Sequence, residues 1–251
     1  MRSRIELIWC VAMTLAATLV PRLAAGQALD IAGPGFEAGE REVKSVNVVN
    51  VSRHGAPRSS HEVNAAYAPL DWLKLAVHLD LENVADGAWQ ADHAALEFQV
   101  KVVEASAKGG VSLAWFTSIE VSTHKDTTNT LVFGPIASVQ LGPATFTLNT
   151  YFGDTFGRNR SDGLAFQYGG QARVDIGGDV AVGIEAFGKL EDVAHPSPLD
   201  EQDHRLGPAM YLTIPPEGAV GHAFGIEAAM LFGLTEASPA VGFKLSAAVV
   251  Y

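Results

Sequence analysis

Cysteine is nearly absent from this chain of 251 residues, in which Cys10 is the only one. A single thiol forms no intramolecular disulfide and cannot build a cysteine-based zinc site. Basic residues are scarce too, with 17 Lys and Arg against 28 Asp and Glu, and the formal net charge is −11. The chain therefore lacks the broad basic surface through which proteins bind nucleic acid, and no nucleic-acid partner is expected.

Long hydrophobic runs are missing as well. The most extended apolar stretch, residues 8–20, is shorter than the roughly 18 apolar residues of a membrane helix. It follows Arg2 and Arg4 and precedes small residues at 24–28, which is the order found in a secretory signal peptide. We predict that residues 1–28 are a signal peptide cleaved near Gly26 or Ala28. An uncleaved N-terminal anchor is the alternative.

Alternation of apolar and polar residues is what the sequence has in abundance. Across residues 73–81, leucine or valine stands at every second position, with Lys74, His78 and Asp80 among the residues between them. A β-strand sorts such residues onto two faces, whereas a helix would scatter the charges around its axis. The pattern recurs and predicts twelve strands, at residues 42–53, 60–69, 72–84, 91–103, 111–123, 129–140, 144–153, 163–176, 179–191, 204–214, 221–233 and 239–251.

The connections between these strands favour a membrane barrel. Turns after even-numbered strands are short, and most connections after odd-numbered strands are longer and more polar, as in outer-membrane barrels with short periplasmic turns and longer outside loops. We predict an all-β fold, an antiparallel transmembrane β-barrel of about twelve strands over residues 42–251, with both termini periplasmic and residues 29–41 as a periplasmic lead segment. A soluble periplasmic β-sandwich binding protein is the alternative, because its strands alternate too.

The end of the chain points to the same location. Tyr251 is preceded at every second position by Val249, Ala247, Leu245 and Phe243. This ending resembles the C-terminal signature by which bacterial outer-membrane barrels are recognised for assembly. The expected partners are therefore the outer-membrane assembly machinery, acting on the strand that ends at Tyr251, and the lipid and lipopolysaccharide of a Gram-negative outer membrane.

Several short motifs resemble a known family. They lie at residues 35–40 (GFEAGE), 66–69 (AYAP), 73–82, 133–135 (FGP), 206–208 (LGP) and 233–238 (GLTEAS). They are similar to motifs of the bacterial family named for the MetA pathway of phenol degradation, a group of predicted outer-membrane β-barrels. The resemblance covers most of residues 35–251 and rests on short motifs rich in Gly, Pro and aliphatic residues. It implies transport of small organic compounds, aromatic ones included, and carries over no catalytic residue.

The inward-facing side of the strands is the candidate functional site. Its polar positions form a predicted lumen lining of Lys74, His78, Asp80, Glu82, Glu97, Gln99, Lys101, Glu120, Asn149, Gln167, Gln171, Arg173, Asp175, Glu185, Lys189, Glu227 and Lys244. Seven of these residues are acids and five are bases, so the lining is nearly balanced in charge. The sequence leaves two readings open, a wet pore lined by opposed charges and a lumen plugged by charges that pair across it.

The function expected from these features is a passive outer-membrane channel or uptake protein for small solutes. A plugged structural or surface-binding barrel is the alternative, and a membrane hydrolase is a third. An enzyme is not predicted, because the chain has no G-x-S-x-G nucleophile elbow and its carboxylates are explained by salt bridges across the lumen. No cofactor is expected, and loop histidines His54, His61, His195 and His204 are taken as exposed side chains that bind no metal.

Overall fold

The computed structural model describes residues 29–83, 87–105, 109–124, 128–157, 160, 162–215 and 223–251. The predicted signal peptide, residues 1–28, lies outside the described residues. The strands are β1 (Arg41–Val51), β2 (Arg58–Leu70), β3 (Leu73–Asn83), β4 (Trp89–Val103), β5 (Val111–Ser122), β6 (Asn129–Leu141), β7 (Ala144–Phe156), β8 (Ala165–Gly177), β9 (Val180–Leu190), β10 (Asp203–Ile214), β11 (Ala223–Gly233) and β12 (Val241–Val250), with a 3-10 helix η1 (Leu199–Glu201) between β9 and β10.

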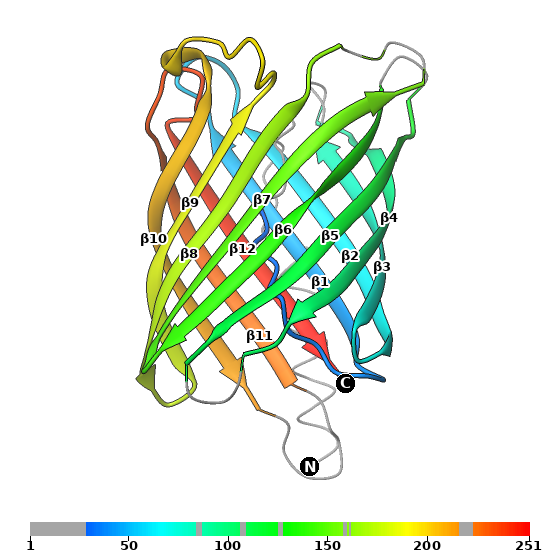
Figure 1. The fold of residues 1–251 in the computed structure, drawn as a ribbon. Coiled ribbons are helices and arrows are strands. Elements are labelled where there is room, and N and C mark those ends of the chain that lie inside the picture. The colour runs from blue at the N-terminus through cyan, green and yellow to red at the C-terminus, as the bar shows by residue number, and fades with distance from the viewer. Residues whose placement is uncertain are drawn as a thin grey trace.

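The twelve strands form one closed antiparallel barrel (Figure 1). Each strand pairs with its neighbours in the sequence, and β1 closes the barrel by pairing with β12 from Glu42–Val250 to Val51–Val241. Closure gives both edges of the sheet a hydrogen-bonding partner, which a strand needs when no water can reach its backbone. The predicted fold class is confirmed, and every predicted strand is present with ends that differ by at most three residues.

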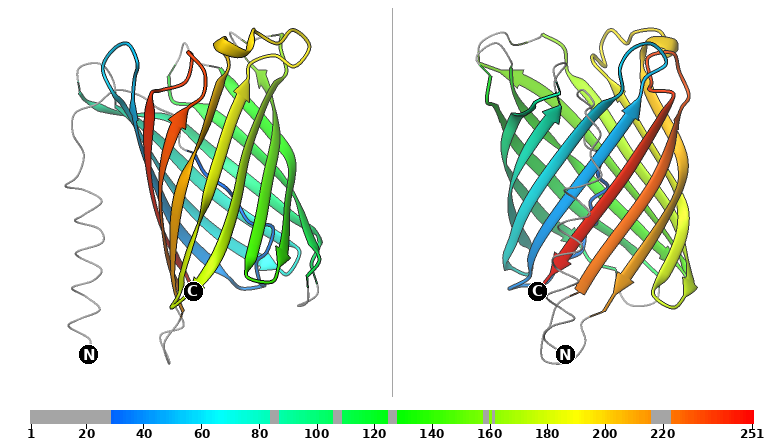
Figure 2. Two further views of the ribbon diagram at one scale, coloured as in Figure 1. Left: turned by 90° about the vertical axis from the view of Figure 1, so that its left-hand side faces the viewer. Right: turned by 180° about the vertical axis from the view of Figure 1, so that it is seen from behind.

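The tight turns after β2, β6 and β8 lie at one end of the barrel, which we call the short-turn end, and the longest connection, after β9, lies at the other, which we call the long-loop end (Figures 1 and 2). The connections after β4 and β10 span residues 104–110 and 215–222, so the prediction that turns after even-numbered strands are short is wrong for these two. The C-terminus lies at the short-turn end, and the connection that carries η1 lies at the long-loop end. The turn between β8 and β9 shows why these turns are tight: Gly177, Gly178 and Asp179 all have positive φ, at 92°, 63° and 65°. Glycine adopts such angles without strain, and aspartate tolerates them better than most residues. Among the described residues, no helix is long and apolar enough to cross a membrane.

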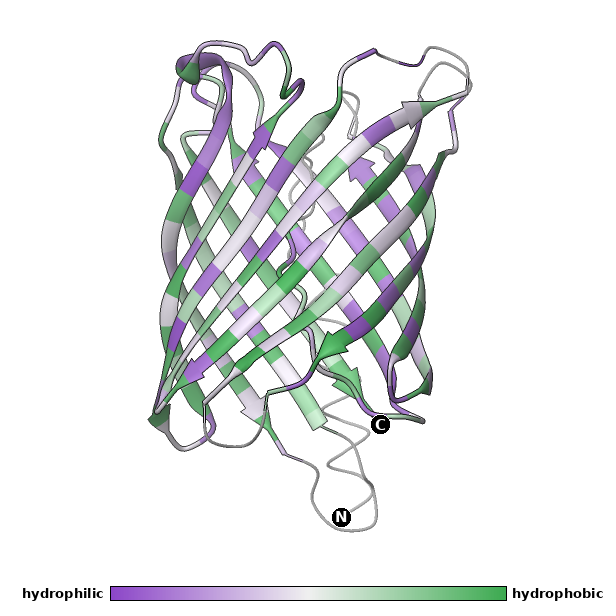
Figure 3. Cartoon of the chain, in the orientation of Figure 1, coloured by the Kyte–Doolittle hydropathy of each residue, from purple (hydrophilic) through white to green (hydrophobic). Residues whose placement is uncertain are grey.

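The barrel wall has two chemically different faces. Large apolar side chains point outward and are exposed, such as Val77 (56%), Leu96 (43%) and Trp115 (45%). Their neighbours along the strands point inward and are small or polar, such as Ala76 and Gln99, which are buried. Figure 3 shows the resulting alternation of hydrophobic and hydrophilic residues along the strands. This is the inverse of a soluble sandwich, whose large apolar side chains face inward.

Residues 29–36 are not a periplasmic lead segment, and this part of the prediction is wrong. The segment runs inside the barrel before the chain turns into β1 at Arg41 (Figures 1 and 2). Leu29, Ile31 and Phe36 are at most 9% exposed. Leu29 and Ile31 join a buried cluster with inward-facing residues of β1, β9, β10 and β11, and this removes their apolar surface from water.

Candidate functional site

A cavity of about 660 Å³ occupies the lumen. Its lining reaches the long-loop end of the barrel at Thr128, Glu191 and Asp203, and it includes residues 29–33 of the N-terminal segment. Nine of the seventeen predicted lumen residues line it, namely Lys74, His78, Asp80, Glu82, Glu97, Gln99, Glu120, Gln167 and Lys189. The period-two pattern of the strands brings these side chains together, although they come from five strands.

Carboxylates dominate the cavity lining. The acids are Asp30, Glu42, Glu62, Asp80, Glu82, Asp92, Glu97, Glu120, Glu191 and Asp203. The Lys and Arg residues are Lys44, Lys74, Lys189 and Arg205. Ten acids therefore face four permanent bases, and the cavity is far more acidic than the nearly balanced lumen that the sequence predicted.

Three of the cavity-lining acids were absent from the lumen lining predicted from the sequence, each for a different reason. Glu62 lies on β2, whose alternation is weak, yet Ser60, Glu62 and Asn64 occupy every second position and could have been recognised. Asp92 lies where the β3–β4 register shifts, because Asp80 pairs with His93 and Leu81 with Ala91. A bulge of this kind changes the direction in which a side chain points, so a strict count of alternate positions does not predict that Asp92 faces the cavity. Asp30 was missed because its segment was placed outside the barrel.

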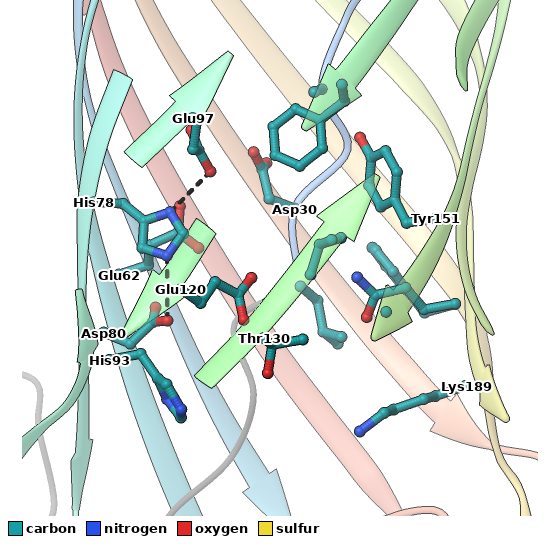
Figure 4. A pocket seen from close by; sticks show the side chains of 18 of the residues that line it. Asp30, Glu62, His78, Asp80, His93, Glu97, Glu120, Thr130, Tyr151 and Lys189 are labelled. Carbon is teal, nitrogen blue, oxygen red and sulfur yellow. Dashed lines mark hydrogen bonds and ion pairs between the residues drawn. The ribbon is translucent and has the colours of Figure 1, made fainter. Parts of the chain in front are cut away.

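Six of the acids lie on four neighbouring strands and form what we call the acid wall. It consists of Glu62 on β2, Asp80 and Glu82 on β3, Asp92 and Glu97 on β4, and Glu120 on β5. The pairing of the strands sets Glu62 opposite Asp80. Figure 4 shows labelled acid-wall residues on one side of the cavity and Tyr151 and Lys189 on the other.

Only part of the acid wall is compensated. The His78 ring bridges two acids, with Nδ1 at 2.8 Å from Glu97 Oε1 and Nε2 at 3.4 Å from Asp80 Oδ2 (Figure 4). Asn64 donates a hydrogen bond of 2.9 Å to the other Glu97 oxygen. Within the described part of the chain, Glu62 and Glu120 have no ion pair within 4 Å. Their carboxyl groups therefore line the cavity without a compensating cation from this part of the chain.

The rest of the cavity lining carries aromatic rings and cations that already have partners. The rings of Phe116, on the same strand as Glu120, and Tyr151, on β7, lie 4.9 Å apart at an angle of 40°. Lys189 pairs with Glu191 at 2.9 Å, and Arg205 pairs with Asp203 and donates a 2.7 Å hydrogen bond to Asn50. These cations are neutralised locally, so they do little to offset the acid wall.

A second charged group, which we call the paired wall, lies on β8 to β12 and does not line the cavity. It consists of Arg173, Glu185, Tyr211, Glu227 and Lys244. Lys244 Nζ lies 2.8 Å from Glu185 Oε2 and also pairs with Glu227, and the side chains of Lys244 and Glu185 are fully buried. The Tyr211 hydroxyl donates a 2.9 Å hydrogen bond to Glu185, and the Arg173 guanidinium lies 5.8 Å from the centre of the Tyr211 ring.

The remaining predicted lumen residues have other surroundings. Gln171 is paired in register with Glu185, next to the paired wall. Asp175 is exposed near the end of β8. Lys101 and Asn149 contact the N-terminal segment, as does Gln99 from the cavity lining.

Four polar contacts hold the N-terminal segment in the lumen. Lys44 Nζ pairs with Asp30 Oδ1 at 2.5 Å, Gln99 donates to the Gly33 carbonyl at 2.9 Å, and Lys101 donates to the Phe36 carbonyl at 2.7 Å. The Asn149 amide, oriented to satisfy both neighbours, donates to the Ala32 carbonyl at 3.0 Å and accepts from its N–H at 2.7 Å. The segment thus contacts three of the predicted lumen residues, Gln99, Lys101 and Asn149.

No metal site emerges from the histidines. Among the described residues, no group of three or more His, Cys, Asp and Glu side chains is arranged to hold a metal ion. His61 lies 3.1 Å from Ser45 Oγ, His195 lies 3.1 Å from Asp192, and His204 lies 3.1 Å from the Tyr168 hydroxyl. Hydrogen bonds to nearby polar groups therefore account for these three rings.

The comparisons with known proteins give information on the fold of the chain. No protein-family model and no curated protein sequence matches the chain. Among solved structures, the KdgM porin superposes with a TM-score of 0.50 at 9% identity, over 84% of this chain and 98% of the porin. The chain has a porin-like fold. The KdgM porin in complex with disordered oligogalacturonate (TM-score 0.51, 9% identity) and the NanC porin (0.50, 8%) give the same coverage of 84% and 98%.

Proposed function

We propose that the protein is a passive outer-membrane channel for small solutes and that it favours cations. The observation that carries the preference for cations is the cavity lining, in which ten acids face four Lys and Arg residues. The apolar outer face and the closed barrel support a membrane location, since lipid requires both. The porin-like fold suits passive diffusion.

The expected processing and partners fit this location. A cleaved signal peptide over residues 1–28 would export the chain, and the strand ending at Tyr251 would bind the outer-membrane assembly machinery. Outer-membrane lipid and lipopolysaccharide would surround the exposed apolar side chains of the barrel. The resemblance to the MetA-pathway family adds small organic compounds to the solutes that we expect.

Electrostatics provides the mechanism for selecting cations. A cleft lined by charge of one sign, with walls of low dielectric constant, concentrates ions of the opposite sign. The acids of the lining act together, because ten carboxyl groups outnumber four Lys and Arg residues. The rings of Phe116 and Tyr151 add a surface on which an organic cation can be held by cation–π attraction. A polyanion such as oligogalacturonate, which is present in one of the KdgM structures, would be repelled.

Planar-bilayer recordings test this proposal. Under a gradient of KCl, the reversal potential of the wild-type barrel should show that K⁺ passes more readily than Cl⁻. At alkaline pH, where both side chains are ionised, the double variant Glu62→Gln/Glu120→Gln should lower the K⁺/Cl⁻ permeability ratio by roughly fourfold for each charge removed. A unit charge about 10 Å away in water changes the free energy of K⁺ by about 0.4 kcal/mol and that of Cl⁻ by the same amount with the opposite sign.

Asp154 provides a matched control for the double variant. This acid is exposed on β7, between Gly153 and Thr155, which line the cavity, so it belongs to the outer face of the barrel. Asp154→Asn should leave the permeability ratio unchanged. A wild-type barrel that prefers Cl⁻, or a double variant with the wild-type ratio, would refute selection by the acid wall. A barrel that never conducts would favour the plugged structural barrel.

A further inference from the structure

The N-terminal segment differs from the barrel wall in how it is held. Within the described residues, positions 29–36 make no backbone–backbone hydrogen bond to any strand, whereas each strand pairs with two neighbours along its length. The polar contacts of the segment run through the side chains of Lys44, Gln99, Lys101 and Asn149. It can therefore leave the lumen without breaking the sheet.

The N-terminal segment, residues 29–36, lies in the lumen at the end of the cavity that is nearer to the short turns. Residues 29–33 line the cavity, but Pro34, Gly35 and Phe36 do not, and neither does Lys101, which holds Phe36. Lys101 Nζ also lies 4.9 Å from the centre of the Phe36 ring. Beyond this point the chain turns at the short-turn end, where Gly39 has a φ of 88° and donates a 2.7 Å backbone hydrogen bond to Ala68 of β2. The cavity therefore ends where the segment passes toward the short-turn end of the barrel.

We propose that residues 29–36 are a displaceable plug, and that their release joins the cavity to the periplasmic side of the barrel. This inference rests on the proposed channel function. The turn at Gly39 would serve as the hinge, since its hydrogen bond to Ala68 anchors the base of the segment to β2. If the signal peptide is cleaved after Gly26, the mature chain starts at Gln27, just before the plug, and if it is cleaved after Ala28, the chain starts at the first residue of the plug, Leu29. A free end can swing out of the lumen without being threaded through the barrel.

A reversible cross-link tests the plug in the full-length folded barrel. Gln99 reaches the Gly33 carbonyl from β4, and a Cβ added at Gly33 meets nothing within 4 Å. The variant Gly33→Cys/Gln99→Cys can be bridged by a short bis-thiosulfonate linker that a reductant cleaves. Its single-channel conductance in a planar bilayer is measured before bridging, after bridging and after reduction. Gly33→Cys alone, treated with the same linker, is the control.

A deletion provides the complementary variant. Removing residues 29–36 while keeping the preceding sequence should raise the mean conductance by roughly twofold or more, because the bore widens where the segment lay. Bridging the two cysteines should lower the mean conductance by a comparable factor, and reduction should restore it. The bridged variant keeps the whole chain, so it tests the plug even if the deleted chain fails to fold.

The outcomes separate the plug from the channel. Equal conductance in the bridged, reduced and deleted barrels would overturn the plug and leave the channel intact. Absence of conductance in every barrel, the deleted one included, would overturn the proposed function and the plug with it. Conductance that falls on bridging and returns on reduction, while the single-cysteine control is unaffected, would support the plug.

Discussion

On the acid wall, Glu62 and Glu120 face the cavity without an ion pair within 4 Å among the described residues, whereas on the paired wall Glu185 and Glu227 both pair with Lys244. The two walls carry carboxylates on the same inward face of one sheet. They differ in access to water, because Glu62 and Glu120 line the cavity and Glu185 is fully buried. A fully buried carboxylate needs a compensating cation, whereas a carboxylate that borders a cavity has room for solvent beside it.

This difference separates two roles for charge in one barrel. The paired wall fixes the positions of β9, β11 and β12 relative to one another, since its ion pairs join Glu185, Glu227 and Lys244 from these strands. On the acid wall, Glu62 and Glu120 line the cavity without such a partner among the described residues. A substitution should therefore change stability on the paired wall and selectivity on the acid wall.

The largest expected effect follows from removing the buried cation. Lys244→Met would leave Glu185 and Glu227 close together without their partner. Loss of one partner of a buried ion pair costs about 3–5 kcal/mol, so the free energy of unfolding should fall by that amount. Urea unfolding of the barrel in lipid vesicles, followed by gel mobility and tryptophan fluorescence, measures the change.

Lys189→Met is the matched control for this prediction. Lys189 lies on β9 like Glu185, but its side chain is 37% exposed and its partner Glu191 is 77% exposed. An exposed ion pair contributes about 0–1 kcal/mol, so the control should unfold at nearly the wild-type urea concentration. If Lys244→Met were no more destabilising than Lys189→Met, the distinction between the walls would be lost.

A smaller effect is expected where the barrel meets water at its two ends. In the connection between β9 and β10, the Ala194 N–H and then His195 lower the pKa of Asp192 below its ordinary value of 3.8. At the short-turn end, burial raises the pKa of Glu40 above its ordinary value of 4.5. Carboxyl ¹³C NMR titration should show Asp192 losing its proton at the lower pH of the two.

The sign of the Asp192 effect on stability follows from proton binding. Between its folded and unfolded pKa values the unfolded chain holds more protons, so Asp192 stabilises the loop above about pH 3.8 and this contribution is lost as the pH falls through the folded pKa. His195→Ala should move the titration of Asp192 upward. Titration of Asp192 at or above 3.8 in the wild type would refute the contacts described for this loop.

The strands could be predicted because their chemistry is local. A wall with an apolar outer face requires apolar side chains at every second residue, and this pattern located all twelve strands and the inward direction of His78, Glu97 and Lys244. The same alternation identifies the residues that point inward, and therefore the polar side chains among them. For this reason the candidate lumen residues could be identified before any contact between strands was known.

The rest depends on contacts between distant parts of the chain. Lys244 and Glu185 are 59 residues apart, and only the lateral register of β9, β11 and β12 shows that they pair instead of lining a pore. The N-terminal segment has no alternation, and its place in the lumen depends on inward side chains such as Lys44 and Lys101. Asp92 enters the cavity through a register shift that no count of alternate residues predicts.

The most direct test of the account is the permeation of organic ions of one size and different charge. Liposome swelling would compare a small organic cation, a neutral analogue and an organic anion, in the wild-type barrel and in the barrel without residues 29–36. An acidic lumen predicts that the cation enters fastest and the anion slowest in both barrels. Entry of the anion as fast as the cation in both barrels would contradict it.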